Sequence, residues 1–170
     1  MESGLTTRPI AALVEEYLSE LLNHGVSEST AKAYQDRLRY FGDWLSSTGI
    51  RLEAVTRDTI QQHLSDLRVQ KYSAKYISVR LSALKCFFGW LVHDKEILAK
   101  DPAARIRSVR VPRRIPRFLE EAEVEIFVAA AATSRERVIV ELVYGSGFRS
   151  AELLELDVED LSLAGAEALV

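Results

Sequence analysis

Apolar residues recur at helical spacing through most of the chain, and this pattern predicts a mainly α protein. Four segments each carry a stripe of apolar residues along one helix face, and residue types that begin or end helices, namely serine, threonine and glycine, separate them. Four helices joined by short loops predict a compact bundle. The stripes cover residues 10–22, 34–45, 60–67 and 77–91, the capping residues are Ser27, Thr56 and Ser73, and the terminating glycines are Gly25 and Gly49.

The pattern changes after the fourth stripe. Residues 107–117 contain two prolines and no long apolar period, which excludes a regular helix there. Helical spacing then returns over 120–131 and 135–144, followed by a short helix from about Arg149. Residues 167–170 are typical of the beginning of a strand. We therefore predict a helical domain over 1–106, a linker over 107–117 and part of a second domain over 118–170.

Composition narrows the class of protein. A hydrophobic content of 48% and a charged content of 28% are those of an ordinary globular protein, and no apolar run is long enough to cross a bilayer. With no signal peptide at the N-terminus either, we expect a cytoplasmic protein without a membrane partner. The single cysteine, Cys86, excludes an internal disulfide and a cysteine-based zinc site, and we interpret it as a thiol packed between helices. His63 lies on an apolar face and is interpreted as a core or edge histidine, and we expect neither a metal nor a cofactor.

The net charge of −3 conceals a strong asymmetry. Residues 1–117 hold 19 Lys and Arg against 13 Asp and Glu, whereas residues 118–170 hold 3 against 12. The basic excess is densest over 100–117, with seven basic residues and one acid. Such a distribution is typical of a protein whose N-terminal part binds DNA, although a solvated linker with scattered charges also accounts for it.

Residues 138–149 combine an apolar run, two glycines and an arginine. The run over 138–144 predicts a buried helix, and Gly145 and Gly147 predict a turn that takes positive φ. Arg149 then opens the next helix, where it faces the positive end of the helix dipole. That position favours an anion that approaches the turn, and the alternative is a simple pairing of Arg149 with Glu152 on the same face.

The stretch Tyr-Gly-Ser-Gly-Phe-Arg-Ser-Ala-Glu-Leu at 144–153 resembles the first catalytic-arginine box of the tyrosine recombinases, which include phage integrases and Xer-type recombinases. The following Leu-Asp-Val-Glu-Asp-Leu at 156–161 also fits that family, and Phe148 in place of the usual leucine is a mild departure. Three earlier segments resemble the family in the same order, so the resemblance covers most of residues 10 to 165. These segments are residues 27–45, 73–91 and 116–123.

The resemblance implies a four-helix SAM-like core-binding bundle, a basic linker, and the first helices and beginning of a strand of a truncated catalytic domain. It implies a DNA-binding fragment of a site-specific recombinase, which cuts and rejoins double-stranded DNA through a 3′-phosphotyrosyl intermediate. The parent would act as a homo- or hetero-tetramer on its DNA sites. By resemblance, Arg149 is the first catalytic arginine, which stabilises charge on the phosphate oxygens, and Glu152 orients the site. The family's chemistry needs no metal.

The remaining catalytic residues of that family are missing from this sequence. No histidine is followed by arginine three residues on, no lysine-bearing hairpin follows the arginine box, and none of the six tyrosines lies in a nucleophile context. The chain alone is therefore predicted to be inactive in cleavage. Two other functions stay open: a naturally short DNA-binding protein that occupies recombination sites without cutting, and a helical protein-interaction module.

Candidate DNA contacts fall into three groups of cationic and hydroxyl side chains. Such donors suit phosphate oxygens and a helix that lies in or along the major groove, and linker arginines suit a chain that follows the DNA backbone. An ordinary solvated helix face is the alternative for the two helical groups. The candidates are Thr30, Lys32, Arg37 and Arg39 on the second helix, Lys75, Ser78, Ser82 and Lys85 on the fourth, and Arg110, Arg113, Arg114 and Arg117 in the linker.

Overall fold

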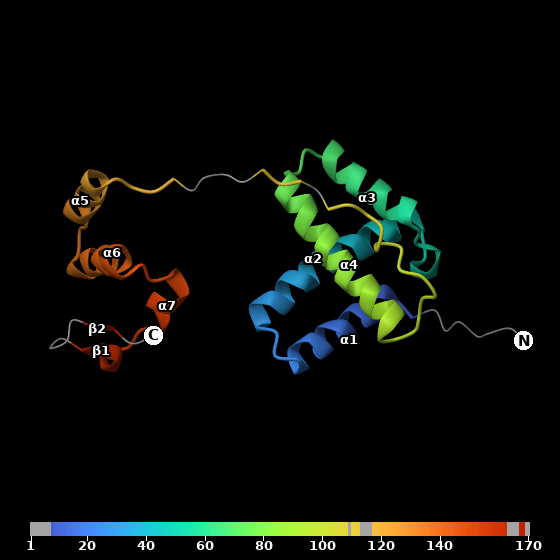
Figure 1. Cartoon of the computed structure of the whole chain (residues 1–170), viewed down its shortest axis with the longest axis horizontal. Coiled ribbons are helices and arrows are strands. Elements are labelled where there is room, and N and C mark those ends of the chain that lie inside the picture. Colours follow the sequence, from blue (N-terminus) through green and yellow to red (C-terminus); the bar gives the residue numbers. More distant parts are fainter. Residues whose placement is uncertain (1–7, 109, 113–116, 163–166, 169–170) are drawn as a thin grey trace, which may run out of the picture. The chain divides into compact units, whose positions relative to one another are not determined.

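The computed structural model describes residues 8–108, 110–112, 117–162 and 167–168. The chain divides into two compact units, Met1–Arg113 and Arg114–Val170 (Figure 1). Each unit is described by itself.

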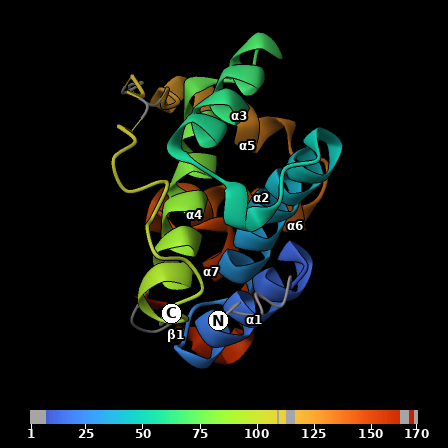
Figure 2. The same cartoon turned by 90° about the vertical axis from the view of Figure 1, so that its right-hand side faces the viewer.

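The first unit is the predicted four-helix bundle. Its α4 packs against each of the other three helices, and α1 packs against α2 (Figure 2). The prediction of a mainly α protein with this bundle is confirmed. The helices are α1 (Ile10–Asn23), α2 (Glu28–Thr48), α3 (Arg57–Val69) and α4 (Ala74–His93), with a short 3-10 turn, η1 (Leu52–Ala54), between α2 and α3.

The helix ends follow from local chemistry. The hydroxyl oxygens of Ser27, Thr56 and Ser73 each accept a hydrogen bond from the backbone N–H three residues on, at 3.4, 3.2 and 3.2 Å. Gly49 takes a left-handed conformation with φ of 69° and ends α2. These caps were predicted from the sequence and are confirmed.

The core of this unit is aliphatic and aromatic. The rings of Phe41, Phe87 and Phe88 are at most 1% exposed, and burial of each contributes about 1.5–3 kcal/mol to stability. The chain returns to this core after α4, because Ala103 and Ile106 are also buried. The segment that follows α4 is therefore anchored on the bundle as far as Ile106.

The second unit has little buried surface among its described residues. Within 117–160, only Val124 is buried. The beginning of a strand predicted near residue 167 is present as one half of a two-residue antiparallel pair, in which Leu161 lies opposite Ala168. The elements are α5 (Glu121–Ala130), α6 (Ser134–Ser146), α7 (Ser150–Glu155), η2 (Val158–Asp160), β1 (Leu161–Ser162) and β2 (Glu167–Ala168).

Two expectations about α6 are wrong. The apolar run over 138–144 is not buried, since Val138 and Tyr144 are 49% and 58% exposed. Although α5 and α7 pack against α6, they bury none of its side chains. Gly145 lies within the helix, and only Gly147, with φ of 71°, takes the positive φ that ends it.

Cys86 is also placed differently from the prediction. The thiol is exposed instead of packed between helices, and the Tyr34 hydroxyl lies 3.6 Å from its Sγ atom. In the described part of the chain, no helix is both long and apolar enough to cross a membrane.

Candidate nucleic-acid interface

A polar face runs along α4 on the side away from the core. Lys75, Ser78, Ser82 and Lys85 recur at helical spacing, whereas Ile77, Leu81, Leu84 and Phe88 point into the core between them. Lys75 and Ser82 are exposed, and Ser78 and Lys85 are half-buried. One rigid helix therefore presents all four predicted contacts of this group together.

The two serines of this face are not equivalent. The Ser82 hydroxyl donates to the Ser78 backbone carbonyl at 3.1 Å, as hydroxyls within helices often do. Its single proton is thus used inside the helix, and its lone pairs face outward as acceptors. Donation to a phosphate from this face therefore rests mainly on the Lys75 and Lys85 ammonium groups and on Ser78.

The predicted contacts on α2 lie along its first half. Thr30 and Lys32 are exposed, and Arg37 is half-buried with its guanidinium 5.9 Å from the centre of the Tyr34 ring. The Thr30 hydroxyl oxygen accepts from the Ser27 hydroxyl at 2.9 Å, so it is part of the helix cap. Arg39 is exposed and pairs with Asp36 at 3.8 Å.

A buried arginine connects the two helices, and the sequence reasoning missed it. The guanidinium of Arg80 lies between the rings of Tyr40 on α2 and Tyr76 on α4, at 4.2 and 4.3 Å from their centres. It donates to the Arg37 backbone carbonyl at 3.3 Å and to the Tyr76 hydroxyl. Because Arg80 contacts both helices, it sets the spacing between their polar faces. The signal in the sequence was an arginine inside an apolar stripe with a tyrosine four residues earlier.

His63 belongs to the core, as the sequence predicted. It is 1% exposed and makes edge-to-face contacts with Phe41 and Trp44, at 5.1 and 4.9 Å between ring centres. Burial lowers the pKa of His63 to about 4, so the imidazole is neutral at physiological pH. Its role is packing, and it adds no charge to the interface.

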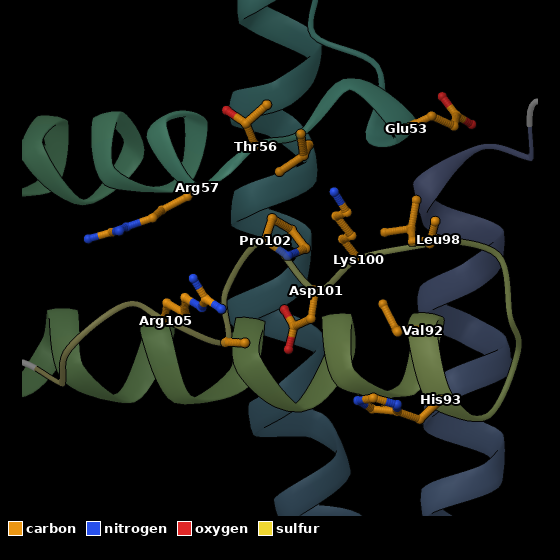
Figure 3. Close-up of a pocket in the computed structure, with 13 residues that line it drawn as sticks. Glu53, Thr56, Arg57, Val92, His93, Leu98, Lys100, Asp101, Pro102 and Arg105 are labelled. Carbon is orange, nitrogen blue, oxygen red and sulfur yellow. The ribbon is translucent and has the colours of Figure 1, made fainter.

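The segment after α4 begins the basic part of the chain. Asp101 accepts a hydrogen bond from the Ala103 backbone N–H at 2.7 Å, which forms a turn at this point. A cavity of about 940 Å³ lies between this segment, α3 and the end of α4 (Figure 3). Among the predicted linker contacts, Arg110 and Arg117 are exposed, whereas Arg113 and Arg114 lie outside the described residues.

Arg149 and Glu152 form a local pair in the second unit. Arg149 occupies the position just before α7 instead of its first turn, and its side chain is 84% exposed. One Glu152 oxygen accepts from the Arg149 backbone N–H at 2.8 Å, and the other accepts from its Nη1 atom at 2.6 Å. These two hydrogen bonds hold the pKa of Glu152 below its ordinary value, so the carboxylate is charged at neutral pH. The pairing that the spacing allowed is therefore present.

Comparison with known proteins identifies similar sequences. Residues 14–95 match the family described as phage integrase, N-terminal SAM-like domain. The chain is 32% identical to the tyrosine recombinase XerD of Pseudomonas aeruginosa over 157 residues, which are 89% of this chain and 52% of that protein. It is 31% identical to the XerD of Vibrio cholerae over 161 residues, which are 91% of this chain and 53% of that protein. The chain thus spans about half the length of the curated relatives it matches.

Solved structures are similar in fold. A lambda integrase dimer bound to a COC′ core site matches 89% of this chain and 42% of its own chain, with a TM-score of 0.70 and 20% identity. A lambda integrase tetramer bound to a Holliday junction matches 95% of this chain and 51% of its own, again with a TM-score of 0.70 and 20% identity.

Proposed function

Since this chain carries the N-terminal SAM-like domain of the phage integrase family, we propose that it binds double-stranded DNA in site-specific recombination. It is also a relative of the XerD tyrosine recombinases. The arrangement of α2 and α4 is the observation that carries the proposal. Each helix presents cationic and hydroxyl groups outward, and Arg80 holds the two helices together beneath them. Two fixed rows of donors suit a duplex, whose phosphates lie at regular intervals.

The proposed DNA contacts divide by chemistry. Lys32, Lys75 and Lys85 act as point charges toward phosphates, and Thr30 and Ser78 add neutral hydrogen bonds. Arg37 contributes a planar guanidinium group, which can donate two hydrogen bonds to a guanine base or to a phosphate. The linker residues Arg110, Arg113, Arg114 and Arg117 would follow the DNA backbone, and their contribution falls steeply with salt.

In the second unit we propose that Arg149 is a catalytic arginine and that Glu152 positions it. Glu152 engages one guanidinium nitrogen and the backbone of Arg149, which leaves the outer N–H groups of this exposed side chain facing solvent. Guanidinium donors aimed at a phosphate stabilise the charge that develops on its non-bridging oxygens during transfer. An arginine already oriented by a carboxylate needs less reorganisation at that moment.

The domain roles follow from these assignments. We propose that residues 1–106 form the core-binding domain, 107–117 the linker, and 118–170 the first part of a catalytic domain. A full-length recombinase would cut and rejoin DNA through a 3′-phosphotyrosyl intermediate, in a homo- or hetero-tetramer. The lambda integrase tetramer on a Holliday junction supports that assembly by its similarity in fold.

The binding proposal is tested by titrating the whole 170-residue chain against a random-sequence duplex at several salt concentrations. We expect salt-dependent binding, and a double variant Lys75→Gln/Lys85→Gln whose log–log salt slope is weaker by about 0.9 for each phosphate that it no longer neutralises. Arg8→Gln/Arg51→Gln removes the same charge from exposed positions outside α2 and α4 and should leave the slope nearly unchanged. Binding that does not depend on salt, or no binding at all, would contradict the proposal and favour a protein-interaction module.

The catalytic proposal needs a recombinase of the relatives' full length that contains this sequence. Arg149→Ala should abolish covalent complex formation on a nicked suicide substrate while DNA binding is retained. Glu152→Gln should reduce the rate less, because the guanidinium remains and only its orientation is loosened. Cleavage by the Arg149→Ala variant at the normal rate would refute the assignment.

A further inference from the structure

A second basic surface is lined by none of the residues of the polar faces of α2 and α4. A groove of about 380 Å³ runs between α3 and the segment that follows α4. Its apolar floor includes Leu64 and the buried Ile106. Four exposed arginines line it: Arg57 and Arg68 on α3, and Arg105 and Arg107 on the segment.

The folding of the bundle brings these four charges together. Arg57, Leu64 and Arg68 lie on one face of α3, because they follow the helical period at intervals of seven and four residues. Ile106 is 5% exposed and anchors the segment so that its two neighbours, Arg105 and Arg107, line the same groove. Arg57 and Arg105 also line the neighbouring cavity of about 940 Å³, and Figure 3 shows Arg57 on α3 and Arg105 on the segment after α4. Arginines of α3 and of the segment, which are 37 to 50 positions apart in the sequence, therefore form one cationic surface.

The groove has no internal counter-charge in the part of the chain that the structure describes. None of its four arginines forms an ion pair there, whereas Arg8, Arg39 and Arg149 each pair with a carboxylate. Four like charges along one groove repel one another, and an anion from outside relieves that repulsion. The surface is therefore built to attract an anionic ligand.

We propose that this groove binds the phosphate backbone of DNA as a contact surface additional to α2 and α4, an inference that rests on the proposed function. The polar side chains of the groove are four guanidinium groups and Gln61, so the groove offers almost only hydrogen-bond donors. A phosphodiester strand offers acceptors and no donors along its backbone, and each guanidinium fork matches two phosphate oxygens. An acidic peptide carries backbone N–H donors as well, and these find few acceptors here. Two of its arginines, Arg105 and Arg107, also belong to the basic stretch 100–117 of the sequence.

The test compares the whole chain with an Arg57→Gln/Arg68→Gln variant on a random-sequence duplex. Both side chains are exposed on α3, so the fold is kept, and a denaturation midpoint checks this. We expect the log–log salt slope of binding to become less steep by about 1.8, equally for unrelated duplex sequences. The charge-matched control is again Arg8→Gln/Arg51→Gln, whose positions lie outside the groove.

Each outcome separates the groove from the proposed function. If the α3 double variant binds DNA with the same salt slope as the unmodified chain, the proposal that the groove contacts DNA is wrong. DNA binding by α2 and α4 is then not contradicted. No DNA binding by the unmodified chain overturns both. If the variant instead loses only a low-salt self-association of the chain, the groove binds an acidic segment of a second copy, and the DNA assignment is wrong.

Discussion

The guanidinium carbon of Arg80 lies 4.2 Å from the centre of the Tyr40 ring, so a charged side chain of α4 packs on an aromatic side chain of α2. Arg80 is only 9% exposed, and among the described residues no carboxylate pairs with it. Two tyrosine rings and a backbone carbonyl take the place of a counter-ion. The contact replaces part of the hydration that the charge loses on burial.

Arg80→Leu should lower the free energy of unfolding by about 2 kcal/mol, because it removes two cation–π contacts and a charged hydrogen bond. Arg80→Lys should restore only part of this stability, since an ammonium lacks the planar fork that reaches both rings and the carbonyl. Urea denaturation measures both. Arg39→Leu, on the exposed surface of α2, is the control and should change stability by less than about 0.5 kcal/mol. Equal effects of the two leucine variants would contradict the bridging role of Arg80.

His63 makes stability depend on pH. Its pKa is about 4 in the folded chain and 6.5 when exposed, so the unfolded state binds the proton more readily. The stabilisation is therefore complete above pH 6.5 and is lost as the pH falls through 6.5 toward 4, by about 3 kcal/mol in total. Comparing His63→Leu with the unmodified chain over this range isolates the contribution from that of the carboxylates.

Two glycines should respond to alanine in opposite directions. Gly49 ends α2 with φ of 69°, where an alanine is strained even though no atom lies within 4 Å of the new Cβ. Gly49→Ala should therefore cost about 1 kcal/mol. Gly89 lies inside α4, also with no atom within 4 Å of a Cβ, so Gly89→Ala should raise stability by about 0.5–1 kcal/mol. Thermal denaturation measures whether each variant is more or less stable than the unmodified chain. A destabilised Gly89→Ala variant would contradict the claim that a methyl group fits at that position without a clash.

Hydrogen exchange should separate the two units. Nine side chains of α4 are buried, and none of α6 is. Because the free energy of local opening follows the buried apolar contacts, amides of α4 should exchange roughly a hundredfold or more slower than those of α6. Exchange measured by mass spectrometry on the whole chain tests this, with α1, whose inner face is also buried, as the internal control. Equal protection in α4 and α6 would contradict the difference in packing.

The sequence by itself determined where three helices of the bundle begin and where α2 ends. Ser27, Thr56 and Ser73 contact the N–H groups three residues on, so their effect needs only the local chain. The periodic apolar stripes likewise determined which side of each helix faces the core, and His63 was placed there correctly. The pairing of Arg149 with Glu152 could be read from their spacing for the same reason.

Only the tertiary structure decided which charged side chain is buried and whether a predicted apolar helix is covered by another element. The contacts of Arg80 with α2 and the arginine groove each join residues 37 to 50 positions apart, and no local period encodes such contacts. For that reason the Cys86 thiol and the apolar residues of α6 were predicted to be buried, whereas both are exposed. Local hydrogen bonds and helical periodicity act over a few residues, whereas burial depends on which distant element, if any, covers a side chain.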